Sequence, residues 1–239
     1  MTKLLLLSDI HANFPALEAV VQFFSDVNFD AICNCGDSLV YAPFPNETLA
    51  WLERNKVHSI LGNTDRKVKK LLKGKTFKKP RLPEKRIMYT WTAEHLTSSA
   101  KRHILSLKKS KQLRINKHRI CLFHGSPADP DEFLFPDTAP ERFSELAQSC
   151  PCNIIFCGHS HTPFHKQFSN SHFINPGSVG RMFDSNPAAS CAVVTIKGES
   201  VTTEFFRIPW SIEKMFLALK RNRLPDVYQR MYTLGKKLN

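Results

Sequence analysis

The sequence predicts an α/β fold, because short apolar segments with the length of buried strands alternate with amphipathic helical patterns. The chain has 239 residues, of which 42% are hydrophobic, enough for one domain with its own core. Strand–helix repetition implies parallel strands joined by right-handed crossovers. We therefore expect a single domain over residues 1–239, and the composition excludes wholly disordered and collagen-like chains.

The first quarter of the chain shows the strand–helix alternation most clearly. Buried strands are expected at Lys3–Ser8, Ala31–Cys35 and Val57–Leu61. Between the first two, Pro15 can occupy the first turn of a helix, and Asn46–Asn55 is the second helix. The apolar face of the first helix consists of Leu17, Val20, Val21 and Phe24.

The rest of the chain is expected to contain a helical insertion, further strands and a helical tail. The insertion covers about residues 66–110, with a break near Pro80–Pro83, and the tail covers about 210–239. The predicted elements between them are a strand pair at about 112–123, an acidic, proline-rich loop at Ser126–Pro140, a helix at Pro140–Ser149, a buried strand at Asn153–Cys157, and strands up to Ile208 with turns at Ser169–Ser171 and Lys197–Gly198.

Positive charge is concentrated in a few segments of a chain whose formal net charge is +13. Residues 66–86 contain eleven lysines and arginines and one acid, and residues 101–119 contain eight and none. Residues 1–65 are acidic instead. Basic segments of this kind bind polyanions through counterion release, so nucleic acid is a candidate partner of residues 66–119. The alternative is a solvated basic surface without a partner.

Neither a membrane span nor an export signal is expected. The apolar run Leu4–Leu7 is far shorter than the roughly 20 residues of a membrane helix. The seven cysteines, an odd number without an export signal, favour reduced thiols in a cytoplasmic protein. Cys33/Cys35 and Cys150/Cys152 have C-x-C spacing, which does not match a C-x2-C zinc site. Most cysteines lie in or beside apolar runs, so we expect small core residues.

Polar motifs with metal-binding residues follow five of the predicted strands. They read Asp9-x-His11, Gly36-Asp37, Gly62-Asn63-x-Asp65, His124-Gly125 and Gly158-His159-x-His161. Open α/β sheets bind ligands at the carboxyl ends of their strands, where these motifs would converge. A glycine beside four of the motifs lets the backbone turn sharply there. One motif alone is more often a turn or a helix cap, but five in this order indicate one site.

The mixture of imidazole, carboxylate and amide groups indicates the kind of metal. It suits manganese, iron, zinc, nickel or cobalt better than calcium or an iron–sulfur cluster. Asp37 is suited to bridging two ions because a carboxylate has two oxygens. The candidate ligands are Asp9, His11, Asp37, Asn63, His124, His159 and His161.

The order of these motifs resembles the calcineurin-like metallophosphoesterase superfamily. The segments Ser8–Asn13, His124–Pro127 and Asn175–Gly180 are similar to its small prokaryotic phosphodiesterase branch. The resemblance covers about residues 3–208. It implies a four-layer αββα sandwich, in which two mixed β-sheets are flanked by helices, with residues 66–110 as a basic helical insertion.

The resemblance also implies a role for each ligand. Asp9, His11 and His161 would hold one divalent ion, and Asn63, His124 and His159 the other, with Asp37 bridging. Asp37, Asn63 and His159 are thereby the catalytic candidates. Two divalent ions, most of all manganese, would convert a bridging water into hydroxide, which attacks phosphorus in line with the leaving group.

Thr64 departs from the family pattern. Many members have a histidine there that helps to protonate the leaving alkoxide, and a threonine has no proton that titrates near neutral pH. Losing a general acid costs about 10²–10⁴-fold when the leaving group is poor. We hypothesise a preference for diesters or anhydrides whose leaving groups need little protonation. The alternative is that His159, His165 or a water donates the proton.

Two more residues are candidates for substrate binding beside Thr64. Arg181 follows the Asn175–Gly180 segment and can stabilise phosphoryl charge, or it is a surface residue. Asn13 either lines the site or caps the helix that follows it. Ser126 follows His124-Gly125, but no acid–base partner pattern marks it as a nucleophile.

Several functions compete on the sequence alone. We favour a phosphodiesterase acting on a phosphorylated small molecule or a nucleotide. Alternatives are a phosphomonoesterase or protein phosphatase, and a nucleotide pyrophosphohydrolase. A nuclease is motivated by the basic residues 66–119. A non-catalytic scaffold is disfavoured, because all seven ligand positions are kept whereas the superfamily's retromer scaffold subunit has lost ligands.

Overall fold

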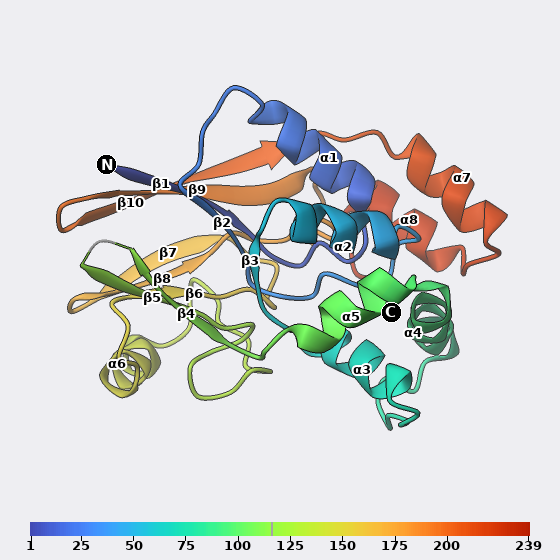
Figure 1. The fold of residues 1–239 in the computed structure, drawn as a ribbon, viewed down its shortest axis with the longest axis horizontal. Helices are drawn as coiled ribbons and strands as arrows, with labels where there is room; N and C mark the ends of the chain where they lie inside the picture. The colour runs from blue at the N-terminus through green and yellow to red at the C-terminus, as the bar shows by residue number, and fades with distance from the viewer. Residues whose placement is uncertain (116) are drawn as a thin grey trace.

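The computed structural model describes residues 1–115 and 117–239. Two five-stranded mixed sheets pack face to face, with helices on both outer faces (Figure 1). The predicted four-layer αββα sandwich is therefore confirmed. Residue 116, within the predicted strand pair 112–123, lies outside the described residues.

The first sheet combines three parallel strands with an antiparallel hairpin. Its strands are β1 (Thr2–Leu7), β2 (Ala31–Asn34), β3 (His58–Ser59), β9 (Ala189–Lys197) and β10 (Ser200–Ile208). Their spatial order is β10-β9-β1-β2-β3, with β1, β2 and β3 parallel. β1 lies at the centre and is buried on both faces, which is typical of a parallel strand and explains its continuous run of leucines.

The second sheet has the order β4-β5-β6-β8-β7. Its strands are β4 (Lys111–Ile115), β5 (His118–Leu122), β6 (Ile154–Phe156), β7 (Phe164–Phe168) and β8 (Ser171–Asn175). β5, β6 and β8 are parallel, and the two edge strands pair antiparallel to their neighbours. The carboxyl ends of β5 and β6 therefore lie at the same edge of this sheet.

Alternation along the central strands builds three apolar layers. Leu4 and Leu6 of β1 point between the sheets, where they pack with Ile120 and Phe156. The intervening leucines pack instead under α1 (Phe14–Phe23) and α2 (Pro45–Arg54) on the outer face. On the other side of the sandwich, α6 (Pro140–Ser149) covers the second sheet. The period of two along a strand thus fixes which side chains fill each layer.

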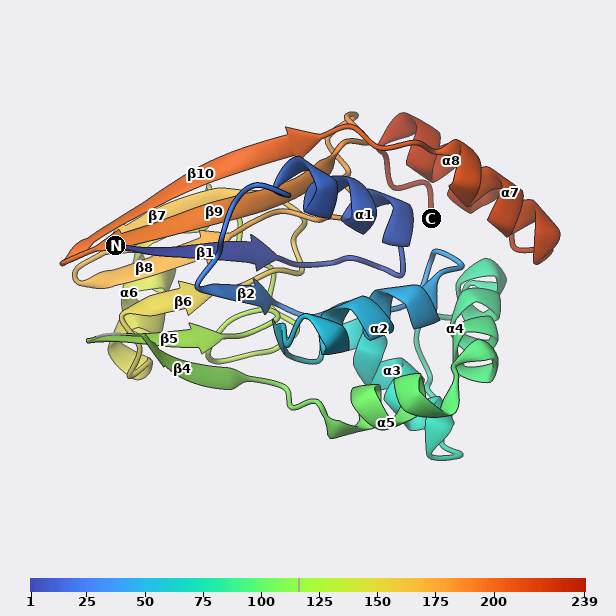
Figure 2. The same cartoon turned by 45° about the horizontal axis from the view of Figure 1, so that its top comes forward.

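The remaining helices gather at one end of the sandwich, beyond the carboxyl ends of β1 and β2 (Figure 2). They are α3 (Asn63–Leu72), α4 (Pro83–His95), α5 (Ser98–Ser106), α7 (Glu213–Arg221) and α8 (Val227–Leu234). The basic segment and the C-terminal tail thus lie at the end where the strand-end motifs converge. Among the described residues, no helix is long and apolar enough to cross a membrane.

Two predicted boundaries differ from the structure for reasons of hydrogen bonding. β3 is shorter than Val57–Leu61, because the Val57 N–H donates to Leu52 and the Leu61 N–H donates to Lys108 instead of to the sheet. The first insertion helix starts at Asn63 rather than at 66. The Asp65 carboxylate accepts from the Gly62 N–H at 3.1 Å and so satisfies the helix start.

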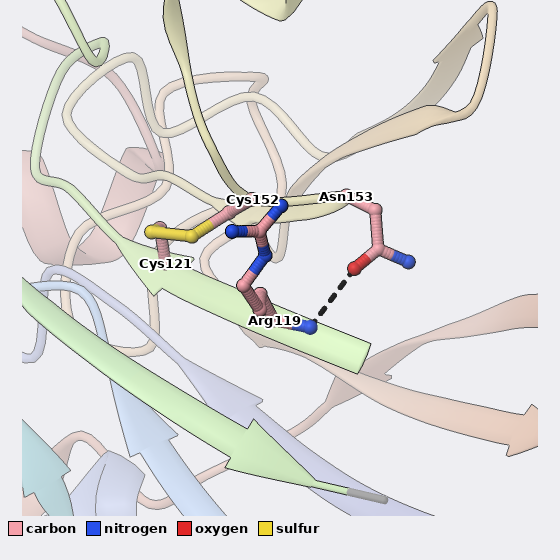
Figure 3. Close-up of a disulfide and its surroundings, with 4 residues drawn as sticks. All are labelled: Arg119, Cys121, Cys152 and Asn153. Carbon is pink, nitrogen blue, oxygen red and sulfur yellow. Dashed lines mark hydrogen bonds between the residues drawn. A yellow bond between two sulfur atoms is a disulfide. The ribbon is translucent and has the colours of Figure 1, made fainter. Parts of the chain in front are cut away.

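The prediction of reduced thiols is wrong for two of the seven cysteines. Cys121 on β5 and Cys152, just before β6, form a disulfide with a Cα–Cα distance of 5.8 Å (Figure 3). Beside it, the Arg119 backbone N–H donates to the Asn153 side chain. The pairing depends on the register of β5 against β6, which cysteine spacing does not show. The other five cysteines are free and buried, as expected of core residues.

Candidate metal centre

All seven predicted ligands lie just after the carboxyl ends of strands, at one end of the sandwich. Asp9 and His11 follow β1, Asp37 follows β2, and Asn63 opens α3 just after β3. From the second sheet, His124 follows β5, and His159 and His161 follow β6. Residues as far apart in the sequence as Asp9 and His161 thus meet, because the strands that carry them end on the same side of the sandwich.

The first ligand group consists of Asp9, His11 and His161, all buried. His161 Nε2 lies 3.2 Å from Asp9 Oδ1 and 3.3 Å from His11 Nε2. His11 Nε2 lies 3.8 Å from the same Asp9 oxygen. Three potential ligand atoms therefore point at one position.

The second ligand group consists of Asp37, Asn63, His124 and His159. His124 Nε2 lies 3.5 Å from Asp37 Oδ2 and 3.1 Å from Asn63 Oδ1. His159 directs its Nδ1 atom toward this group, whereas His124 directs its Nε2 atom toward it. Asp37 Oδ2 also lies 3.9 Å from His11 Nε2, so one carboxylate oxygen faces both groups.

Two buried polar groups show that these residues fit metal ions. Asp9 Oδ1 accepts no hydrogen bond from the described residues although it is fully buried. The inward amide atom of Asn63 lies 3.0–3.2 Å from Asp37 Oδ2, His124 Nε2 and His159 Nδ1. If that atom is the oxygen, all four atoms are lone-pair donors suited to a cation. If it is the nitrogen, its two N–H groups donate to two of the other three atoms and replace the cation.

Backbone carbonyls orient three of the histidines toward the site. The Nδ1 atoms of His11, His124 and His161 face the carbonyls of Leu39, Cys35 and Arg181, respectively. An N–H donated from Nδ1 leaves the Nε2 lone pair free for a ligand bond. The Asp9 carboxylate is fixed in the same way, since its Oδ2 accepts from the Ser8 hydroxyl and the His159 N–H.

The backbone at the site is strained. Five of the seven ligands have left-handed φ angles: Asp9 (51°), His11 (53°), Asp37 (51°), His159 (67°) and His161 (56°). Such conformations are uncommon outside glycine and cluster at functional sites. Of the motif glycines, Gly36 has a left-handed φ of +95°. Gly62 is needed for close approach instead, because a Cβ there would lie 2.1 Å from Asp37 Oδ1.

Burial and charge set the protonation states of the ligands, and they leave two of the histidines neutral and ready to bind a metal ion. Burial lowers the pKa of His11 to about 3 and that of His159 to about 4, so both rings are neutral near neutral pH. Burial also opposes ionisation of Asp37, but His124 and His11 outweigh it and hold the Asp37 pKa well below its ordinary value. Against its own burial, His124 has a pKa raised to about 9 by Asp37. A metal ion bound between these two would displace the proton they hold.

The side chains of Thr64 and Asn13 are already engaged. The buried Thr64 hydroxyl donates to Leu39 O at 3.1 Å, and its backbone N–H donates to Asp37 Oδ1 at 2.7 Å. Asn13 caps α1, because its Oδ1 accepts from the Ala16 N–H at 3.1 Å while its Nδ2 donates to Gly180 O at 3.0 Å. Thr64 thus positions Asp37. Asn13 caps the helix that follows it, which was the alternative to lining the site.

Arg181 is buried, not a surface residue. Its guanidinium lies 3.9 Å from the centre of the Tyr41 ring, with Phe183 and Tyr228 farther out. It forms no ion pair with a carboxylate in the described part of the chain. A cation held by aromatic rings rather than by an acid keeps its charge available to an anion.

Sequence reasoning missed the aromatic and acidic residues around the ligands. Phe133 stacks on His159 at 4.0 Å between ring centres, and Phe183 stacks on His161 at 4.7 Å. Asp65 links the loops that carry Asp37 and Asn63, since it accepts from the N–H groups of Gly62, Ser38 and Leu39. Asp65 stood within a recognised motif, but no spacing signal marked either phenylalanine.

A third group of potential ligands lies in the second sheet. The sulfur atoms of Cys121, Cys150 and Cys152 lie within 4.8 Å of one another. Two of these sulfurs are joined in the disulfide and are not available as thiolate ligands.

The sequence and the fold are similar to those of known proteins. Over 247 aligned residues, the chain is 27% identical to the uncharacterized protein MJ0912 of Methanocaldococcus jannaschii, with 96% of this chain and 97% of the relative covered. Its fold is similar to that of the hypothetical protein PH1004 of Pyrococcus horikoshii, with a TM-score of 0.87 at 19% identity over 99% and 100% of the two chains. A metallophosphoesterase of Sphaerobacter thermophilus gives a TM-score of 0.79 at 24% identity over 98% and 99%.

These structural likenesses define an αββα fold. The family model for the calcineurin-like phosphoesterase superfamily domain matches residues 2–199. The chain therefore belongs to the calcineurin-like phosphoesterase superfamily. Membership supports a hydrolase that acts on phosphoesters, and the two Asp/His groups support the use of divalent metal ions.

Proposed function

We propose that the protein is a two-metal phosphodiesterase. The observation that carries this proposal is the position of Asp37, whose Oδ2 lies 3.5 Å from His124 Nε2 and 3.9 Å from His11 Nε2. One carboxylate therefore faces both ligand groups, as a bridging ligand must. Manganese is the favoured metal, with iron, zinc, nickel and cobalt as alternatives.

Each ligand group has its own part in this proposal. Asp9, His11 and His161 would hold one ion, and Asn63, His124 and His159 the other. Two divalent ions held there would activate a water for attack on phosphorus and neutralise the phosphoryl oxygens. Asn63 and His159 are the half-exposed members of the ligand set, so they lie on the side from which substrate approaches.

The surroundings of Thr64 favour substrates with good leaving groups. Its hydroxyl is buried and already donates to Leu39 O, so it cannot protonate a leaving alkoxide. His165, an alternative proton donor, lies 3.0 Å from His172 Nδ1 across β7 and β8. Activated diesters and anhydrides need little protonation and are therefore preferred over alkyl monoesters.

Arg181 is proposed to bind a phosphoryl oxygen. Its carbonyl orients His161 and its guanidinium lies against Tyr41, so the residue joins the metal ligands to an uncompensated positive charge. An arginine can hold two oxygens of a phosphate with two parallel hydrogen bonds. Arg181→Met should therefore raise KM for diesters and leave the number of bound metal ions unchanged.

A matched assay tests the proposal. The metal-reconstituted protein would be offered bis-p-nitrophenyl phosphate and p-nitrophenyl phosphate with manganese, nickel, cobalt or magnesium, and Asp37→Ala would serve as the control. We expect faster hydrolysis of the diester, abolished by the substitution. Faster hydrolysis of the monoester would contradict the diester preference and favour a phosphatase. No turnover together with no bound metal would favour the scaffold alternative.

A cytoplasmic location stays a prediction.

A further inference from the structure

A groove lies directly beside the second ligand group. It has a volume of about 670 Å³ and is lined by twelve residues, among them Asn63 itself. Seven of the twelve are lysines, and the single acid is Asp131. Residues of α3, the turn after it and the segment after α5 form its walls. We call this feature the lysine groove.

Part of its positive charge is already engaged. Arg66 forms an ion pair with Asp131, which uses the single acid. Lys69 Nζ donates to the carbonyls of Leu105 and Leu107 and so ties α3 to α5. These contacts build the wall of the groove and leave no carboxylate in it to balance the other lysines.

Five lysines of the groove have no such partner. In the described part of the chain, the side chains of Lys70, Lys73, Lys75, Lys108 and Lys109 are exposed and make neither an ion pair nor a hydrogen bond to the protein. Like charges gathered in one concave surface repel each other and concentrate anions there. The charge of the groove is therefore complementary to a ligand with several negative charges.

The direction of the groove ties that ligand to the metal centre. Lys70 follows Asn63 on α3 by seven residues, roughly 10 Å along the helix axis, and Lys73 is the residue that caps the carboxyl end of this helix. Lys67, one turn after Asn63, places its Nζ 3.0 Å from the outward amide atom of that ligand. Positive charge thus runs from the ligand group outward along one helix.

The lining favours a chain of phosphates over single-stranded nucleic acid. Sites for single strands pair a basic groove with aromatic rings on which bases stack. No aromatic side chain lines the lysine groove, whose apolar members are Leu61 and Leu107. A linear oligophosphate carries charge on every unit and needs no stacking surface.

We propose that the lysine groove holds the oligophosphate chain of a phosphoanhydride substrate, with the phosphate to be hydrolysed at the Asn63 end. The proposal rests on the two-metal phosphoesterase function and names its substrate class. A water oxygen bonds to the terminal phosphorus, and the P–O bond to the bridging oxygen breaks. The shortened chain leaves with that electron pair, orthophosphate is released, and the proton lost from water passes to the leaving chain or to solvent.

This substrate class also fits Thr64. The leaving group is a phosphate chain, a much weaker base than an alkoxide, so its departure depends far less on a proton donor. An alkoxide needs that donor, and the engaged Thr64 hydroxyl does not supply one. The lysine groove and the threonine at position 64, where many family members have a histidine, therefore favour the same chemistry.

The test compares two triple variants that remove the same charge. The groove variant is Lys70→Ala/Lys73→Ala/Lys108→Ala, and the control is Lys78→Ala/Lys197→Ala/Lys220→Ala, which removes exposed lysines outside the groove. Each is assayed with manganese on inorganic tripolyphosphate and on bis-p-nitrophenyl phosphate, which has one phosphate and does not reach the groove. Circular dichroism confirms folding.

We expect KM for tripolyphosphate to rise at least about tenfold in the groove variant, which corresponds to only about 1.4 kcal/mol shared by three lost contacts. The diester kinetics and the control variant should stay within about twofold of wild type. ATP as a third substrate separates a nucleoside triphosphate from free oligophosphate, since a lower KM for ATP than for tripolyphosphate indicates the nucleoside.

Two results would overturn the proposal while the phosphoesterase function stands. One is an active diesterase whose tripolyphosphate KM is the same in both triple variants. The other is an oligonucleotide of thymidines that binds the wild type but not the groove variant and is not displaced by tripolyphosphate. If the wild type hydrolyses no phosphoester with any metal, the function itself fails. Calorimetric titration of tripolyphosphate into the two variants then still decides whether the groove binds the chain.

Discussion

The two ligand groups differ in how the protein surrounds them. The first, Asp9, His11 and His161, is buried and enclosed by the rings of Tyr41 and Phe183. The second, Asp37, Asn63, His124 and His159, borders the lysine groove at Asn63. Its outer histidine is covered on one face by the exposed Phe133.

With the proposed two ions bound, this difference would give the two groups separate tasks. An enclosed set of ligands with oriented rings holds an ion tightly, because second-layer hydrogen bonds fix each ligand. A set at the edge of a groove exchanges its ion and meets substrate more readily. Asp37 belongs to the second group but lies within 3.9 Å of His11, so it couples the two.

Removing the shared carboxylate should have the largest effect. Asp37→Ala takes a ligand from the second group and the contact with the first, so both ions should bind weakly. We expect turnover to fall by on the order of 10³-fold or more, beyond the loss of a single oxyanion-hole donor. Turnover and bound metal per chain measure the effect, with the exposed Asp26→Ala as control. Full metal content in Asp37→Ala would refute the bridging position.

Single substitutions in the two groups should separate them. His11→Ala should leave one metal ion per chain, held by the second group, and Asn63→Ala should leave one held by the first. In each case we expect activity to fall by about 10²–10³-fold, because attack needs both ions. Metal analysis after gel filtration is the measurement. Loss of both ions from either variant would show that the groups do not bind independently.

A ring substitution tests the cover over the second group. Phe133→Ala exposes one face of His159, so a chelator should remove one of the two metal ions several-fold faster than from wild type. Phe135→Ala is the matched control, because Phe135 stacks on Phe133 but not on His159. Stopped-flow release into a chromogenic chelator measures both rates. Equal rates in the two variants would mean that the ring does not limit exchange.

Most of the fold could be predicted from the sequence, because the periodicity of apolar residues and the positions of turn-forming residues are local signals. The leucines of β1, the proline starts of α1 and α2 and the glycines after strands are all of this kind. The seven ligands could be named because each motif ends a strand. The disulfide, the aromatic rings around Arg181 and the stacking of Phe133 on His159 could not be predicted. They depend on strand register and on the paths of loops between distant segments.

The loop that carries Phe133 offers the smallest and most specific test. Glu132 accepts two hydrogen bonds from Arg142, at 2.8 and 3.0 Å, which fasten the loop to α6. Arg142 holds the pKa of Glu132 below its ordinary value of 4.5, against the effect of burial. A carboxyl with a lowered pKa stabilises the fold above its unfolded-state pKa and loses that contribution as pH falls through the folded-state value.

Glu132→Gln should therefore destabilise the protein near neutral pH by no more than about 1 kcal/mol, because the pair is only partly buried and solvent screens it. The difference from wild type should shrink toward zero in acid, once the pH has fallen through the lowered folded-state pKa of Glu132. Urea unfolding at the two pH values measures this, with Glu145→Gln as control. A difference that persists at acid pH would mean that the amide disturbs packing. Faster metal release from Glu132→Gln near neutral pH would tie the same ion pair to the cover over His159 and so extend the contrast between the two ligand groups to the loop.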